Sequence, residues 1–196
     1  NSVEDLWNRV YRDNYLNWQA PDSKSGCGTV GNAGFRIEAI DKIIEKYNIE
    51  SILDIGCGDL FWMSKIDNLN KIKRYVGVDI STECIKENEE KYKDINNVEF
   101  VISNFGNKSE NTAFESNNGK SWDLVLMFDI LNHCIQNEID EMVDFILRSN
   151  IKYFLTNNHP LEIMEYENEL YKNANDNGAW WPGHWDGKSK FSRNMP

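Results

Sequence analysis

Two acids and two glycines near the middle of the chain have the spacing of a ligand-binding turn. The stretch SILDIGCGDLFWM contains an apolar run that ends in Asp54 and is followed by Gly56 and Gly58. Glycines at the end of a strand permit a tight turn and let a ligand approach the backbone. A second apolar run, YVGVDI, places Asp79 about 20 residues after Gly58, a spacing at which an acid can accept hydrogen bonds from a ribose. These residues predict a nucleotide-type site, although Asp54 alone could be a strand-end cap.

The same turn favours a cationic cofactor over a dinucleotide. A dinucleotide fingerprint needs a third glycine where this chain has Phe61. A pyrophosphate at the turn would also be repelled by Asp54 and Asp59. S-adenosylmethionine carries a sulfonium and an ammonium but no phosphate, so we expect this cofactor and rank a nicotinamide oxidoreductase well below it.

A parallel sheet is needed to bring the two acids to one edge. Five short β-rich runs alternate with helical or loop stretches, and they read SILDI, RYVGVDI, VEFVI, WDLVLMF and KYFLTN. This alternation indicates an α/β fold, because parallel neighbours need crossover connections. We predict a Rossmann-like, doubly wound, mostly parallel sheet with helices on both faces, and ligands at the carboxyl ends of its strands.

The connections around these strands complete the predicted architecture. Apolar periodicity predicts helices over residues 2–15 and 35–48, and the glycine-rich stretch 20–34 between them is predicted to be a loop. The polar stretch 106–121 is predicted to be a flexible surface loop. The resemblance described below implies two further strands after the fifth run, and residues 158–196 lack clear runs for them, so we expect those strands to be missing or trimmed.

Length and composition favour one globular domain over residues 1–196. We divide it into an N-terminal helix with a glycine-rich loop (1–34), a Rossmann-like core (35–157) and a C-terminal lid or substrate segment (158–196); the resemblance described below implies that the loop covers the cofactor. Hydrophobic residues make up 40% of the chain and no run could span a bilayer. The net charge of −11 disfavours polyanions, so a small-molecule substrate is expected, without nucleic acid or membrane. Scattered cysteines predict free thiols, no metal site and a cytoplasmic location; the oligomeric state stays open.

Together these motifs resemble the class I S-adenosylmethionine-dependent methyltransferases. ILDIGCGD is similar to their D-x-G-x-G first motif. DLVLMFDILNHC is similar to their fourth-strand stretch, with Asp129 at the strand end and His133 four residues further on. GCGDLFWM together with the upstream SGCGTVGNAG resembles small bacterial methyltransferases with an S-G-x-G loop and a C-G-D-x-x-W-M first motif.

This resemblance implies S-adenosylmethionine as cofactor and S-adenosylhomocysteine as product. The implied cofactor contacts are Gly26, Gly28, Asp54, Gly56, Gly58, Trp62, Asp79, Ile80, Asn104, Phe105 and Phe128. In this scheme the amides of Gly26 and Gly28 receive the methionine carboxylate. Asn104 departs from the family pattern, which has an acid that accepts a hydrogen bond from the adenine amino group, but its amide oxygen can still accept one.

The expected activity is O-methylation, or less readily N-methylation, of a small polar acceptor such as a sugar or surface-polysaccharide precursor, including an anionic phosphate or phosphoramidate. His133 is the candidate general base, against the alternative that it only packs, and Asp129 is expected to orient the acceptor or the cofactor's ammonium. GAWWPGHWDG is expected to supply a substrate wall, or else a docking flap, through Trp181, His184 and Trp185. The alternative function is a non-catalytic S-adenosylmethionine-binding subunit with the same fold.

Overall fold

Five parallel strands form one sheet in the order β3-β2-β1-β4-β5. The computed structural model describes residues 2–14, 23–24 and 30–156. The strands are β1 (Ser51–Ile55), β2 (Arg74–Asp79), β3 (Val98–Ile102), β4 (Trp122–Met127) and β5 (Ile151–Thr156). The chain runs outward from β1 to β3 and then returns to the other side of β1, so the winding reverses between β1 and β4. In open α/β sheets, ligands bind outside the carboxyl ends of the strands at such a switch point.

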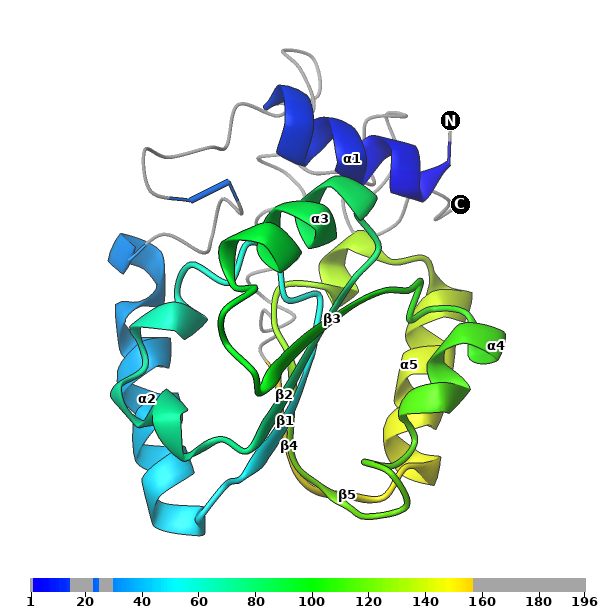
Figure 1. The fold of residues 1–196 in the computed structure, drawn as a ribbon. Coiled ribbons are helices and arrows are strands. Elements are labelled where there is room, and N and C mark those ends of the chain that lie inside the picture. The colour runs from blue at the N-terminus through cyan, green and yellow to red at the C-terminus, as the bar shows by residue number, and fades with distance from the viewer. Residues whose placement is uncertain (1, 15–22, 25–29, 157–196) are drawn as a thin grey trace, which may run out of the picture.

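Helices cover both faces of the sheet, as predicted for a doubly wound fold. α2 (Val30–Tyr47) lies on one face, and α4 (Lys108–Asn111) and α5 (Gln136–Arg148) lie on the other (Figure 1). α3 (Thr82–Lys91) and α1 (Val3–Asp13) are at the carboxyl edge of the strands (Figure 1). Among the described residues, no helix has the length and apolar character needed to cross a bilayer.

The two faces of the sheet bury separate hydrophobic clusters, and β1 contributes to both. Ile52 packs with Ile40 and Ile44 of α2, whereas Leu53 belongs to the cluster that contains Phe145 of α5. Side chains alternate between the faces of a strand, so a strand covered on both faces reads as a continuous apolar run. This burial explains why the strand segments could be recognised in the sequence.

α1 is fastened to the start of α3 by polar contacts. The side-chain oxygen of Asn8 accepts hydrogen bonds from the hydroxyl of Ser81 at 2.9 Å and from the backbone N–H of Glu83 at 3.2 Å. The hydroxyl of Thr82 donates to Glu4 at 2.7 Å. These contacts hold α1 across the carboxyl edge, above α3 (Figure 1).

Two predicted loops differ from the structure. Helix α2 begins at Val30, inside the loop predicted over 20–34. A helical glycine costs only about 1 kcal/mol relative to alanine, so two glycines can be tolerated when the rest of an 18-residue helix packs well. The stretch 106–121 is not simply a surface loop, because it forms α4 and a short 3-10 helix and buries Phe114 in the core. The further strands considered for residues 158–196 lie outside the described residues.

Candidate binding site at the carboxyl edge of the sheet

The glycine turn after β1 has a backbone conformation that suits glycine. Gly56 and Gly58 have φ of +71° and +56°, in the left-handed region. The backbone N–H groups of Gly56 and Cys57 both donate to the carbonyl of Val78, at 2.7 and 3.0 Å. A Cβ atom on Gly56 would also collide with the side chain of Ile130, which follows β4. The turn is therefore held tightly between β2 and the segment after β4.

Asp79 connects the end of β2 to this turn. Its carboxylate accepts hydrogen bonds from the backbone N–H groups of Gly58 at 3.2 Å and Ser81 at 2.8 Å. Burial raises the pKa of Asp79 to about 6, while the hydrogen bonds from Ser81 and Gly58 act to lower it. A carboxylate offers about four lone-pair positions, so the backbone donors leave capacity for a ligand's hydroxyl groups.

Asp54 is a second acid, buried below the turn. It is the last residue but one of β1, a strand that is buried throughout, and the hydroxyl of Tyr75 donates a hydrogen bond to it. Burial raises the pKa of Asp54 to about 7; the Tyr75 hydrogen bond lowers it, and the neighbouring charge of Asp79 raises it. This environment differs from that of an exposed strand-end cap.

The buried carboxyl of Asp54 predicts that stability falls as the pH rises. Its pKa of about 7 in the folded chain exceeds the ~3.9 of an unfolded aspartate, so between these values the folded chain binds more protons. We expect the free energy of unfolding to fall with a slope of up to about 1.4 kcal/mol per pH unit from this group between pH 5 and 7. Denaturant titrations of the wild type and Asp54→Asn should show a steeper fall in the wild type. Equal slopes would contradict the prediction, and Asp144→Asn, on the exposed side of α5, is the control.

An ion pair between two distant segments lies just after the end of β4. The guanidinium of Arg36, from α2, contacts the Asp129 carboxylate at 2.6 Å and lies over the ring of Phe128, with its carbon 5.1 Å from the ring centroid. Asp129 has φ of +56°, which is uncommon for a residue with a side chain. Arg36 was not among the predicted site residues. An arginine in an otherwise amphipathic helix gave no signal that it would pair with an acid so distant in the sequence.

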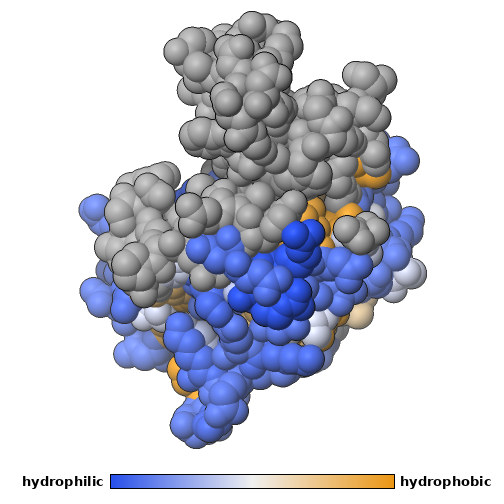
Figure 2. Space-filling model, turned by 90° about the horizontal axis from the view of Figure 1, so that it is seen from above, coloured by the Kyte–Doolittle hydropathy of each residue, from blue (hydrophilic) through white to orange (hydrophobic). Residues whose placement is uncertain are grey.

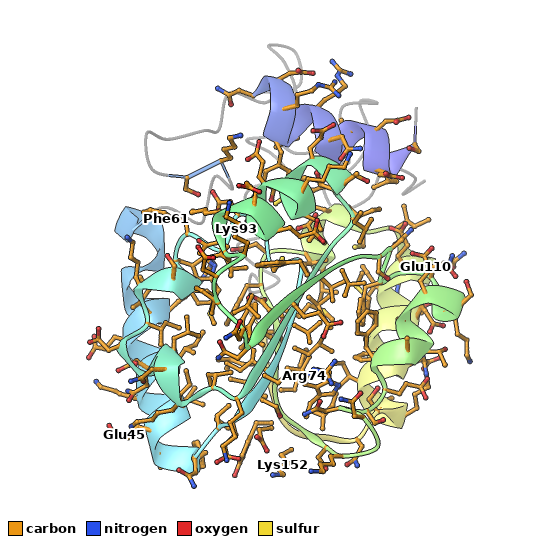
Figure 3. The ribbon with its side chains drawn as sticks, in the orientation of Figure 1. Glu45, Phe61, Arg74, Lys93, Glu110 and Lys152 are labelled. Atoms are coloured by element: carbon orange, nitrogen blue, oxygen red, sulfur yellow. The ribbon has the colours of Figure 1, made fainter. Side chains whose placement is uncertain are left out.

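Three consecutive residues at the end of β3 differ in their surroundings. The hydroxyl of Ser103 is buried and has no hydrogen-bond partner among the described residues. The side-chain oxygen of Asn104 accepts a hydrogen bond from the Gly106 N–H at 3.1 Å, and its backbone N–H donates to Glu110 at 2.6 Å (Figure 3 labels Glu110). Phe105 packs in the core, with its ring centroid 4.8 Å from that of Phe145. The side chain of Phe105 thus lies in the core, and the contact of this residue with the cofactor stays a prediction.

Ser103 provides a test of the ligand at this strand end. Because its hydroxyl is buried and no described residue bonds to it, Ser103→Ala should leave the ligand-free protein as stable as the wild type or slightly more stable. If the hydroxyl binds the cofactor, the same change should weaken S-adenosylhomocysteine binding by about 1 kcal/mol, or roughly fivefold. Thermal unfolding and calorimetry measure the two effects. A variant with lower stability but unchanged affinity would show that Ser103 has only a structural role.

Two further predicted residues belong to aromatic contacts near the crevice. His133 ends a short 3-10 helix (Leu131–His133) and is 9% exposed, and its ring meets that of Trp7 of α1 edge-on, with centroids 5.1 Å apart. Trp62 meets the ring of Phe128 in the same way at 5.7 Å. Ile80 is half-buried beside Asp79. The remaining predicted contacts lie outside the described residues: Gly26, Gly28, Trp181, His184 and Trp185.

Asp59 anchors the chain that leads to the predicted cofactor-covering loop. Its carboxylate accepts hydrogen bonds from the hydroxyl of Ser23 at 3.0 Å and from the backbone N–H of Lys24 at 2.7 Å. The backbone N–H of Phe61 donates to the other oxygen at 3.2 Å. Asp59 was considered only as an acid that repels phosphate, so this anchoring role is new. Seen from above this edge, the described surface is mostly hydrophilic, with smaller hydrophobic areas (Figure 2).

Solved structures share this fold. A SAM-dependent methyltransferase from Anabaena variabilis is 12% identical with a TM-score of 0.63, covering 88% of this chain and 68% of that chain. The N-methyltransferase NodS from Bradyrhizobium japonicum, in complex with S-adenosylhomocysteine, is 12% identical with a TM-score of 0.53, covering 72% and 67%. Magnesium protoporphyrin IX methyltransferase from Synechocystis, with bound S-adenosylhomocysteine, is 16% identical with a TM-score of 0.51, covering 74% and 64%. The predicted fold class is confirmed.

A sequence relative and a family model complete the comparison. A Mycoplasma genitalium protein named "Putative tRNA methyltransferase" is 32% identical over 76 residues, which are 38% of this chain but only 35% of that protein. A family model described as "Methyltransferase domain" matches residues 53–154, more than half of the chain. This match spans the glycine turn, Asp79 and the end of β4, and it confirms the family inferred from those motifs. The chain belongs to the methyltransferase domain family.

Proposed function

We propose that this chain transfers a methyl group from S-adenosylmethionine to an oxygen atom of a small polar acceptor. The observation that carries the proposal is the hydrogen-bonded unit of Asp79 and the glycine turn at the switch point of the sheet. A sugar or surface-polysaccharide precursor is the acceptor class that we favour, including one with an anionic phosphate or phosphoramidate. Family membership supports the enzyme class and the cofactor.

The described residues fit this cofactor along adjacent strand ends. Ser103 after β3 has a buried hydroxyl that could meet an adenine, and Asp79 at the end of β2 has acceptor capacity for ribose hydroxyls. The turn at Gly56 and Gly58 allows close approach, and the acids nearby suit positive charge. The strand order β3-β2-β1-β4 gives these groups the same order along the edge.

The chemistry that the chain must add is limited. When bound, S-adenosylmethionine supplies a methyl group on a sulfonium that is already a good leaving group. The chain therefore has to align the acceptor, exclude water and remove a proton from a hydroxyl. We assign the removal of this proton to the imidazole of His133, which contacts α1 through Trp7 and follows the end of β4. Asp129 acts through Arg36, because its carboxylate already pairs with that guanidinium.

A small acceptor fits the charge distribution better than a tRNA does. The net charge of −11 repels a polyanion. Several cations line a hollow at the amino edge of the sheet, where Figure 3 shows Arg74 and Lys152, but these side chains pair with Glu99 and Asp123. The tRNA assignment in the name of the Mycoplasma relative still makes tRNA the necessary comparison.

Transfer of a radiolabelled methyl group tests the function. The full chain is incubated with methyl-labelled S-adenosylmethionine and either a bacterial small-molecule extract or total tRNA. We expect label in the small-molecule fraction, in a bond that is stable as an ether or ester. Label only in tRNA would overturn the proposed acceptor class. Binding of S-adenosylhomocysteine without transfer to any fraction would favour the non-catalytic binding subunit.

A further inference from the structure

We propose that Asn8 of α1 is a positioning residue that couples cofactor binding at Asp79 to the placement of His133. This inference rests on the proposed function and adds a connection between the two parts of its site. The connection runs through neighbouring residues of α1. Asn8 joins α1 to the segment after β2, and Trp7 joins α1 to His133 after β4.

The first argument is a hydrogen-bonded path from Asn8 to the acid that is expected to bind the ribose. The Asn8 Oδ1 atom accepts from the hydroxyl of Ser81 at 2.9 Å. Ser81 is fully buried, and its backbone N–H donates to the Asp79 carboxylate at 2.8 Å. Its hydroxyl also accepts from the backbone N–H of Cys84 at 3.2 Å and so caps α3. These bonds fix both the backbone and the hydroxyl of Ser81, so a shift of Asp79 is passed to Asn8.

The second argument is the position of α1 relative to the sheet. β2 and β4 lie on either side of β1. Because α1 contacts Ser81 after β2 and His133 after β4, it spans the end of β1, where the glycine turn lies. Trp7 and Asn8 are consecutive in a helix, so their side chains point about 100° apart and can contact separate segments. The helix thus connects the expected cofactor contacts to the proposed base.

The third argument is that the imidazole of His133 is oriented by its packing on α1. Its side chain belongs to a residue that is only 9% exposed, and the ring of Trp7 meets it edge-on. A base removes a proton only when one ring nitrogen is within hydrogen-bond reach of the acceptor. Because Asn8 fixes α1, it also fixes the ring that His133 packs against. A cofactor that holds Asp79 therefore favours one orientation of His133 before the acceptor reacts.

Nuclear magnetic resonance of the His133 imidazole tests the inference. The full chain carries isotope-labelled histidine, and the His133 signal is identified by its loss in His133→Gln. Adenosine is the probe, because it has the ribose that is expected at Asp79 but lacks the sulfur and the amino-acid end. We expect saturating adenosine to shift the His133 signal in the wild type and to leave it unmoved in Asn8→Ala. Adenosine affinity in Asn8→Ala should fall by no more than about fivefold.

The rate of methyl transfer and a conservative variant give a second readout. A displaced catalytic group can cost a large factor in rate, so Asn8→Ala should lower kcat about 10- to 100-fold while the acceptor KM stays within about twofold. Asn8→Asp keeps an acceptor oxygen for the hydroxyl of Ser81 and the N–H of Glu83. It should restore both kcat and the adenosine-induced shift.

Thr82→Val is the matched control. It removes another hydrogen bond between α1 and α3, from the Thr82 hydroxyl to Glu4, whose side chains are not part of the path to Asp79. This variant should keep the shift and kcat. The inference is overturned by a shift that persists in Asn8→Ala, by its absence in a wild type that binds S-adenosylhomocysteine, by Asn8→Asp without rescue, or by equal losses in Thr82→Val. A wild type that binds neither adenosine nor S-adenosylhomocysteine would instead overturn the proposed function.

Discussion

Replacement of His133 by alanine is expected to lower methyl transfer by about 10²- to 10⁴-fold, the usual contribution of a positioned proton transfer. The affinity for S-adenosylhomocysteine should stay within about twofold, because the imidazole acts on the acceptor in this scheme. The wild-type rate should rise with pH as the imidazole loses its proton, and the variant should lose that dependence. Single-turnover rates, measured with labelled cofactor and the fraction that takes up label in the transfer experiment, test both effects.

The contact between His133 and Trp7 requires a separate control. His133 is nearly buried and packs edge-on against this ring, so its removal could act by loosening α1. Trp7→Leu removes the ring contact and keeps the imidazole. If Trp7→Leu lowers the rate as much as His133→Ala and keeps the pH dependence, His133 is a packing residue. An acceptor that is already anionic would need no base, and His133→Ala would then lose little activity.

Replacement of Asp79 by alanine is expected to weaken S-adenosylhomocysteine binding by about 1–3 kcal/mol, or roughly 5- to 150-fold. The change removes the acceptor for the ribose hydroxyls and frees the N–H groups of Gly58 and Ser81. Affinity for 5′-methylthioadenosine should fall by the same factor, since both ligands have the ribose.

Asp79→Asn gives an intermediate test of the same contact. Its amide keeps one acceptor oxygen, so we expect a smaller loss than for the alanine variant. Asp144→Ala, which removes an acid from the exposed side of α5, should leave both affinities unchanged and serves as the charge control. A folded Asp79→Ala protein with wild-type affinity would show that Asp79 only supports the turn.

The strands and the first two acids were predictable because their signals are local. Each strand of the sheet is a short apolar run, and β1, β2 and β4 are buried on both faces. Gly56 and Gly58 mark the place where the chain must adopt positive φ, and Asp79 marks the end of the next strand. Such features can be recognised from residues that lie within a few positions of one another in the sequence.

The remaining parts of the site depend on contacts between distant segments. Arg36 was missed because its partner Asp129 is far away in the sequence. Arg36 precedes β1, Asp129 follows β4, and β2 and β3 come between them. At the end of β3 the family pattern points to Asn104, whose cofactor contact stays a prediction, while the neighbouring Ser103 has a buried hydroxyl with no partner in the described part of the chain. Neighbouring side chains near a strand end point in opposite directions, so the fold decides which of the two can face a ligand. Sequence order alone does not determine that direction.

The acids around the glycine turn also have a consequence for the release of product. In the proposed reaction, the ionised forms of Asp54 and Asp79, which prevail above their pKa values of about 7 and about 6, attract the cofactor's sulfonium, and methyl transfer converts that cation into a neutral thioether. The electrostatic attraction is therefore strongest before transfer and weaker after it. For the proposed reaction, this loss of attraction should make the spent cofactor dissociate more readily than the charged one, so that the same buried carboxyls favour loading and limit product inhibition.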